Sequence, residues 1–240
     1  MRVFPAIHPL APKVLAAALV LLLAACASSG PKGPYPPPEN LRLAAAKRQE
    51  FVASFLQGRW CEAHDLLAQS VEDFLRRDDP CAAAYGHMTL WRLKAYVGLE
   101  DEDARQEALR LRRVGLGCPG MKQLAALDGE EYLAPADRRY QDLLASDDDT
   151  ALLNALEAES DALYASVYAR KAAKAALDAG QPGRARPFLA LARGLDGDRG
   201  WVVFLREDWR LEALTAETTE DRNSIAQRIA ILDALVDTCP

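Results

Sequence analysis

From Leu41 onward, apolar residues are interspersed with polar ones at helical rather than alternating spacing. Alanine, leucine, arginine and glutamate dominate, and no segment alternates apolar and polar residues over the length of a strand. Such a pattern is typical of helices that bury one face. It predicts ten helices, at residues 41–57, 59–76, 80–97, 101–115, 120–128, 135–146, 150–179, 182–194, 198–214 and 219–236.

Local signals mark where several of these helices begin. Asp79 is a favourable N-cap residue, and Pro80 after it suits the first helical position. Residues 181–182 (Gln-Pro) repeat this arrangement with a weaker cap, and residues 218–221 form a capping-box variant with aspartate as the last residue. The loops are short almost throughout, so we expect consecutive helices to be antiparallel neighbours.

Three predicted turns have a common arrangement, in which a helix ends at a glycine and the next helix brings an alanine about five residues later. The pairs are Gly58 with Ala63, Gly98 with Ala104, and Gly180 with Ala185. Glycine permits a tight turn, and alanine lets two helices pack closely. Units of two helices cannot bury their apolar faces alone and therefore stack.

The arrangement resembles the tetratricopeptide repeat (TPR). The resemblance is best over 164–213, fair over 44–76 and loose over 86–116. It implies an all-α fold in which antiparallel helical hairpins stack as a TPR-like α-solenoid. Residues 117–163 depart from the pattern, so we expect an irregular middle. The alternative interpretation is a generic bundle of α-hairpins, which is also all-α.

The N-terminal segment has the features of a secretory signal peptide. Twelve apolar residues, Val14–Ala25, follow the basic residues Arg2 and Lys13. A transmembrane helix needs about 20 apolar residues, so this run is too short for one.

The end of this segment, Leu23-Ala24-Ala25-Cys26, resembles the lipobox of bacterial lipoproteins at every position. The resemblance implies cleavage after Ala25 and acylation of Cys26, which becomes the N-terminus. It also implies an anchored protein on the periplasmic side of the envelope. Because no aspartate follows the cysteine directly, the resemblance favours the outer membrane over the inner one.

These features divide the chain into three parts. Residues 1–25 form the predicted signal peptide. Residues 26–40 comprise the lipidated cysteine and a tether rich in proline, glycine and serine, with a semi-rigid polyproline stretch at 36–38. Residues 41–240 form the predicted TPR-like periplasmic domain.

The charge balance excludes one class of partner. The chain has a net charge of −6, and because Arg2 and Lys13 precede the predicted cleavage site, residues 26–240 carry −8. Nucleic-acid binding requires basic patches, so we expect no nucleic-acid partner.

Four cysteines follow Cys26, and an even number in an oxidising compartment suggests disulfides. If the helices predicted at 59–76 and 80–97 are antiparallel, about fifteen residues at 1.5 Å each separate Cys61 from Cys81 by roughly 22 Å. A disulfide needs Cα atoms within about 7 Å.

The next predicted helix, 101–115, returns the chain toward Cys81. We therefore predict a disulfide between Cys81 and Cys118. Cys61 would then pair with Cys239, which requires the C-terminal tail to fold back. The alternative for Cys61 is a buried free thiol.

Catalytic and metal-binding motifs are not apparent. Cys61 with His64 and Cys81 with His87 could be drawn as a zinc site, but the same 22 Å separates the two halves. The sequence contains no nucleophile elbow, phosphate-binding loop or dinucleotide fingerprint. We predict no enzyme activity, no metal and no cofactor.

Arg170, Lys171 and Lys174 form a compact basic cluster after residue 25. On a helix lining a groove they could hold carboxylates of a partner, and the alternative is a solvated helix face. The four tryptophans lie at helical spacings among leucine and alanine, which is typical of helix-packing residues, and the alternative is that one or two of them line a concave peptide groove. They are Trp60, Trp91, Trp201 and Trp209.

The anchor, the repeat-like hairpins and the lack of a catalytic motif suggest a function. The sequence predicts a non-enzymatic docking or assembly scaffold for envelope proteins or peptides. The alternative is a factor that binds peptidoglycan or assists a cell-wall hydrolase.

Overall fold

The computed structural model of the protein describes residues 39–116, 118, 135–146 and 148–239. The predicted signal peptide, Cys26, the tether up to residue 38 and the predicted helix at 120–128 lie outside the described residues. The helix predicted to begin at residue 41 begins two residues earlier, at Glu39.

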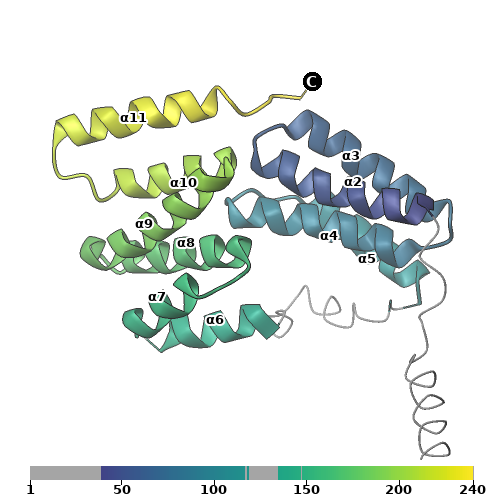
Figure 1. The fold of residues 1–240 in the computed structure, drawn as a ribbon, viewed down its shortest axis with the longest axis horizontal. Helices are drawn as coiled ribbons and strands as arrows, with labels where there is room; N and C mark the ends of the chain where they lie inside the picture. The colour runs from purple at the N-terminus through teal and green to yellow at the C-terminus, as the bar shows by residue number, and fades with distance from the viewer. Residues whose placement is uncertain (1–38, 117, 119–134, 147, 240) are drawn as a thin grey trace, which may run out of the picture. The chain divides into compact units, whose positions relative to one another are not determined.

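All regular structure in the described part of the chain is α-helical. The helices there are α2 (Glu39–Leu56), α3 (Trp60–Leu75), α4 (Pro80–Tyr96), α5 (Glu102–Val114), α6 (Pro135–Ala145), α7 (Asp149–Glu157), α8 (Ala162–Asp178), α9 (Pro182–Arg199), α10 (Val202–Ala213) and α11 (Thr219–Asp233). Helices adjacent in sequence pack side by side, as α3 does with α4, α8 with α9 and α10 with α11 (Figure 1). The prediction of an all-α stack of helical hairpins is confirmed.

Glycines end several helices where the sequence predicted turns. Gly58, Gly98 and Gly180 follow α2, α4 and α8, and their φ angles are +83°, +71° and +70°. This left-handed conformation costs a side chain with a Cβ about 1 kcal/mol or more, so glycine lets the chain reverse between helices.

Two of the predicted N-caps are confirmed. The carboxylate of Asp79 accepts a hydrogen bond of 2.9 Å from the N–H of Ala82 at the start of α4. At the start of α11, the hydroxyl of Thr218 accepts a bond of 3.0 Å from the N–H of Asp221. Gln181, the weaker cap, makes no such bond to the backbone of α9.

The single long helix predicted at 150–179 is wrong, because the chain breaks between α7 and α8. Glu159 lies in the break and accepts hydrogen bonds from the hydroxyl of Tyr140, on α6, and from the N–H of Asp161. Asp161 then caps α8 through the N–H of Leu163 at 2.9 Å. The contact with Tyr140 is between distant residues, so the helical pattern did not reveal it.

The boundaries predicted at 194 and 198 are also wrong, because α9 continues through both. Gly194 and Gly197 lie within this helix, which ends at Gly200 with a φ of +64°. Glycine destabilises a helix interior, but α9 packs against α8 and buries residues from Ala185 to Asp196, which stabilises it.

Small side chains allow α8 and α9 to pack closely. Both helices have buried alanines, of which the repeat-like pattern predicted Ala185: Ala165, Ala169, Ala172, Ala173 and Ala176 on α8, and Ala185 and Ala192 on α9. Large side chains complete the same core cluster, including Phe51, Tyr140, Tyr168, Phe188 and Phe204. A second cluster lies among α2, α3, α4 and α5, around Phe74, Met88 and Leu111. Within the described ranges, no helix is both long enough and apolar enough to cross a bilayer.

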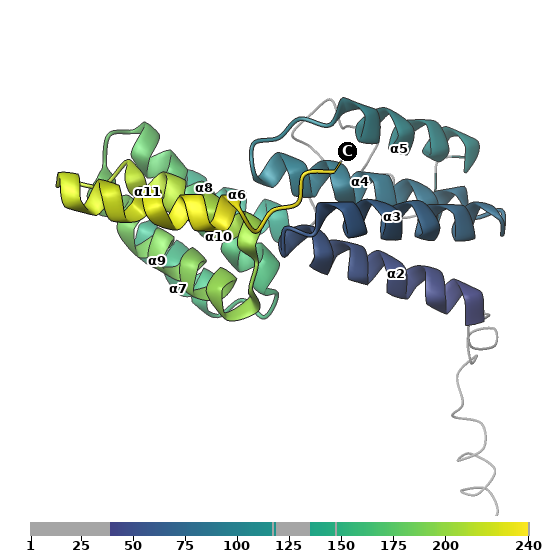
Figure 2. The same ribbon diagram turned by 90° about the horizontal axis from the view of Figure 1, so that it is seen from above.

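Two disulfides join elements that are distant in sequence. Cys81 is bonded to Cys118 and Cys61 is bonded to Cys239, with Cα atoms 5.3 Å apart in both pairs. The second bond is possible because the tail after α11 returns to the start of α3 (Figure 2). In the structure Cys61 is therefore not a free thiol.

Candidate functional site

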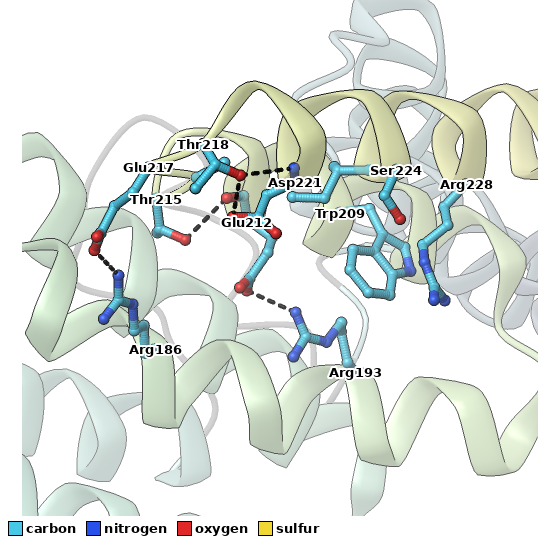
Figure 3. A pocket seen from close by; sticks show the side chains of 12 residues that line it. Arg186, Arg193, Trp209, Glu212, Thr215, Glu217, Thr218, Asp221, Ser224 and Arg228 are labelled. Atoms are coloured by element: carbon cyan, nitrogen blue, oxygen red, sulfur yellow. Dashed lines mark hydrogen bonds and ion pairs between the residues drawn. The ribbon is translucent and has the colours of Figure 1, made fainter.

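An open groove with a volume of about 570 Å³ lies where α9, α10 and α11 meet (Figure 3). We call it the Trp209 groove. Its lining combines charged, hydroxyl and apolar side chains: Arg186, Arg193, Arg228, Glu212, Glu217, Asp221, Thr215, Thr218, Ser224, Trp209, Ala216 and Ile225. A concave surface with a few converging polar groups is the usual form of a binding site.

Trp209, on α10, contacts an arginine from each neighbouring helix. The guanidinium carbon of Arg193, on α9, lies 4.6 Å from the indole centroid, and that of Arg228, on α11, lies 4.7 Å from it. Each contact is a cation–π interaction worth about 0.5–1 kcal/mol at an exposed site. Together they fix the indole at one end of the groove.

Ion pairs hold the walls of the groove in place. Arg193 pairs with Glu212 at 2.6 Å, which joins α9 to α10, and Arg186 pairs with Glu217 at 2.6 Å. The second pair is exposed, with 53% and 79% of the two side chains accessible. Exposed pairs contribute about 1 kcal/mol or less, so a competing charge can replace one partner.

Arg228 is the groove cation without a carboxylate. No acidic side chain in the described segments lies within ion-pair distance of its exposed guanidinium. Asp221 lies seven residues earlier on the same helix, roughly 10 Å away, and accepts a hydrogen bond from Thr218. The groove therefore has a positive end at Arg228 and an acidic end at the start of α11.

A buried charged cluster lies beside the groove. Arg170, on α8, donates to Asp196, on α9, at 2.5 Å and to Asp208, on α10, at 2.7 Å. All three side chains are at most 5% exposed. The guanidinium also donates to the hydroxyl of Ser166 at 3.0 Å and lies 4.2 Å from the ring centroid of Phe204. Because Asp208 precedes Trp209, the cluster and the groove share α10.

Burial controls the ionisation of these aspartates. It raises the pKa of Asp196 to about 8, an effect that the charge of Arg170 opposes and that of Asp208 reinforces. Burial also raises the pKa of Asp208, again against the attraction of Arg170. Arg170 donates to both carboxylates and the two aspartates also act on each other, so they titrate together as one pair.

The structure corrects the expectation that Arg170 lines a partner-binding surface. Its guanidinium is 5% exposed and is committed to Asp196 and Asp208. Sequence spacing placed it beside Lys171 and Lys174, but aspartates from two other helices draw it into the interior.

The two lysines of the same predicted cluster do not converge with it. The ammonium group of Lys171 lies 5.6 Å from the ring of Tyr96 and 4.7 Å from that of Tyr168. Lys174 is exposed and pairs with Asp178 on its own helix at 2.9 Å. The three cations thus have three separate environments.

The tryptophans differ in their surroundings. Trp60 stacks on Phe55 with centroids 5.8 Å apart, and Trp201 meets Phe204 edge to face at 6.0 Å. These two have packing contacts, as predicted. Trp209 instead lines the groove, which was the alternative interpretation for one or two of the tryptophans. The sequence did not identify which one, because its arginine partners come from residues 16 positions before it and 19 positions after it, and no local motif joins them.

The zinc site that could be drawn from the sequence does not form. Cys61 and Cys81 are both in disulfides, so neither thiolate is available as a ligand. Burial lowers the pKa of His87. Among the residues that the structure describes, no group of three or more histidine, cysteine or acidic side chains could hold a metal ion.

Comparisons with known proteins identify no relatives. No protein family matches the chain, and no curated protein or solved structure is detectably similar to it.

Proposed function

We propose that this protein is a lipid-anchored, periplasmic docking scaffold that binds an extended segment of an envelope protein in the Trp209 groove. The observation that carries the proposal is the groove itself, in which charged and aromatic groups from three helices converge on an open space. The anchor is inferred from Cys26 and the residues before it. The stacked helical hairpins agree with the resemblance to tetratricopeptide repeats, which can hold peptides in concave grooves.

The dimensions and chemistry of the groove suit a peptide. It is open rather than enclosed, so a chain can enter and leave at its ends. The hydroxyl of Ser224 faces the groove and can exchange hydrogen bonds with a peptide backbone (Figure 3). Ile225 and the edge of Trp209 supply apolar contact.

The charges favour an occupant with an acidic side chain. Arg228 has no carboxylate partner among the described residues, and it lies over the same indole ring as Arg193, which is paired with Glu212. A carboxylate placed at this end would form charge-assisted hydrogen bonds with guanidinium groups, which are about twice as strong as neutral ones. We therefore propose an extended peptide that carries aspartate or glutamate.

Site-specific photocrosslinking tests the proposal. A benzophenone amino acid replaces Ser224 in the full-length protein, cells are irradiated intact, and the crosslinked peptide is sequenced by mass spectrometry. We expect an acidic segment of an envelope protein, and a synthetic peptide of that sequence should bind the purified protein.

Charge reversal provides the matched control. Arg228→Glu should reduce capture and peptide affinity at least tenfold, whereas Arg113→Glu, at an exposed arginine on α5, should leave both unchanged. Equal capture by both variants would contradict the proposal. Capture of peptidoglycan fragments instead of a peptide, with co-sedimentation on purified sacculi, would favour a cell-wall-binding function.

A further inference from the structure

The buried cluster of Arg170, Asp196 and Asp208 is unbalanced in charge. One guanidinium faces two carboxylates, and Asp196 and Asp208 are fully buried. With both aspartates ionised, the interior would hold one uncompensated negative charge, which is strongly unfavourable in a medium of low polarity. One bound proton makes the cluster neutral.

The hydrogen bonds of the cluster leave room for that proton. Asp196 binds Arg170 through Oδ2, and Asp208 binds it through Oδ1. The other oxygen of each carboxylate is buried and has no hydrogen-bond partner within the described part of the chain. A carboxylic acid is a donor as well as an acceptor, so protonation allows one carboxyl group to donate to the other.

Other charges near the pair do not remove the imbalance. Arg193, on α9, is the further cation that acts on Asp208, but it is already paired with Glu212 on α10. Arg228, on α11, contacts Trp209 on the groove side. Ser166, on α8, is neutral. Arg170 therefore remains the one buried counter-charge in the cluster.

We propose that Asp196 and Asp208 bind a single shared proton in the folded protein, and that this proton couples the packing of α8, α9 and α10, and thereby the Trp209 groove, to external pH. The aspartate pair can affect the groove because Asp196 comes from α9 and Asp208 from α10, and both helices line the groove. Loss of the proton leaves like charges on α9 and α10, one of them on Asp208, the residue before Trp209. The link to ligand binding rests on the proposed function, whereas the bound proton does not.

The direction of the pH effect follows from where the proton binds. An unfolded aspartate loses its proton near pH 4, whereas the folded pair keeps one until about pH 8. The stabilising effect of the proton is complete below pH 4, decreases as pH rises toward 8, and is absent above it. In that window the unfolding equilibrium constant increases by up to about tenfold per pH unit.

Urea unfolding between pH 5 and 9 tests this inference with full-length protein. Asp196→Asn replaces one acid of the pair with a neutral group of the same shape, so its profile should lack the component that wild type shows. Asp208→Asn should do the same, because one aspartate then balances one arginine. Parallel profiles for wild type and both variants would overturn the proposal.

Two spectroscopic measurements complete the test. Infrared spectra of wild type at pH 6.5 should contain the carbonyl band of a buried carboxylic acid, and this band should be absent in Asp196→Asn. Its absence in wild type would overturn the proposal even if the variants fail to fold.

With fluorinated tryptophan, the ¹⁹F resonance of Trp209 should shift with a midpoint near pH 8 in wild type alone. A bound proton with no shift at Trp209 would refute the coupling, independently of whether a peptide binds.

Discussion

The backbone N–H of Asp237 donates a hydrogen bond of 2.8 Å to the carbonyl oxygen of Gly58, so the last residues of the chain dock on the turn between α2 and α3. Space for this contact depends on the glycine. A Cβ on Gly58 would lie 3.1 Å from the carbonyl oxygen of Leu235, and the φ of +83° is itself unfavourable for other residues. The docked tail brings Cys239 to Cys61.

We predict that replacing Cys61 and Cys239 together by serine lowers the free energy of unfolding by about 2–5 kcal/mol. The bond spans 178 residues, and closing so long a loop removes much of the entropy of the unfolded chain. Urea unfolding measures the loss. Peptide mapping without reduction should find the pairs 61–239 and 81–118, and a peptide linking Cys61 to Cys81 would contradict the structure.

Replacing Gly115 and Gly194 by alanine should have opposite effects on the stability of the protein. A Cβ on Gly115 would lie 2.6 Å from the sulfur of Cys81 and 2.7 Å from that of Cys118, which the disulfide holds in place. Gly115→Ala should therefore destabilise the protein by about 1–3 kcal/mol.

Gly194 lies within α9, and a Cβ added there would have no atom of another residue within 4 Å apart from its own helix backbone and chain neighbours. Gly194→Ala should stabilise the protein by about 0.5–1 kcal/mol, because alanine loses less backbone entropy in a helix. Thermal unfolding of both variants checks the pair of predictions, and a destabilised Gly194→Ala would contradict them.

Asp101 should contribute more to stability at neutral pH than in acid. Its carboxylate accepts hydrogen bonds from Lys94 at 2.6 Å and from the N–H of Ala104 at 2.9 Å, where it caps α5. Burial opposes its ionisation, but these two bonds and the charge of Lys94 hold its pKa below the usual range.

The lowered pKa means that stability from Asp101 is present above about pH 4 and is lost as pH falls through the folded value. Asp101→Ala should cost about 1–2 kcal/mol at pH 7 and less at pH 2.5. Asp101→Asn keeps the cap without the charge and serves as the control. Urea unfolding at the two pH values distinguishes them; equal losses for Asp101→Ala at both would refute the assignment.

Lipidation can be tested at Cys26. We expect cells expressing the full-length protein to incorporate labelled palmitate into it, and the protein to sediment with membranes. Cys26→Ser should abolish both, because it removes the acylated thiol. Cys239→Ser should leave both unchanged. Labelling that persists in Cys26→Ser would exclude the lipobox interpretation.

Much of the helical structure could be predicted because its signals lie within a few residues of each other. Gly58, Gly98 and Gly180 end helices through their own backbone conformation, and Asp79 caps α4 through an N–H three residues away. The break before α8 was missed although its N-cap, Asp161, is a local signal; the contact of Tyr140 with Glu159 comes from another helix and has no local signal.

The candidate site was less predictable than the fold. Arg170 belongs to a basic run in the sequence, yet two aspartates more than 25 residues away draw it into the core. Trp209 has the spacing of a packing residue, yet arginines from α9 and α11 place it in a groove.

The sequence by itself determined that this protein is built of helical hairpins, where most of the helices begin and end, and that Cys81 can meet Cys118, whereas the pairing of Cys61 was left open. The tertiary structure alone decided which charges are buried, which tryptophan lines a groove and where that groove opens. The physical reason is the range of the interactions. Helices and caps depend on hydrogen bonds between residues three or four positions apart, whereas burial depends on partners brought together only when helices pack.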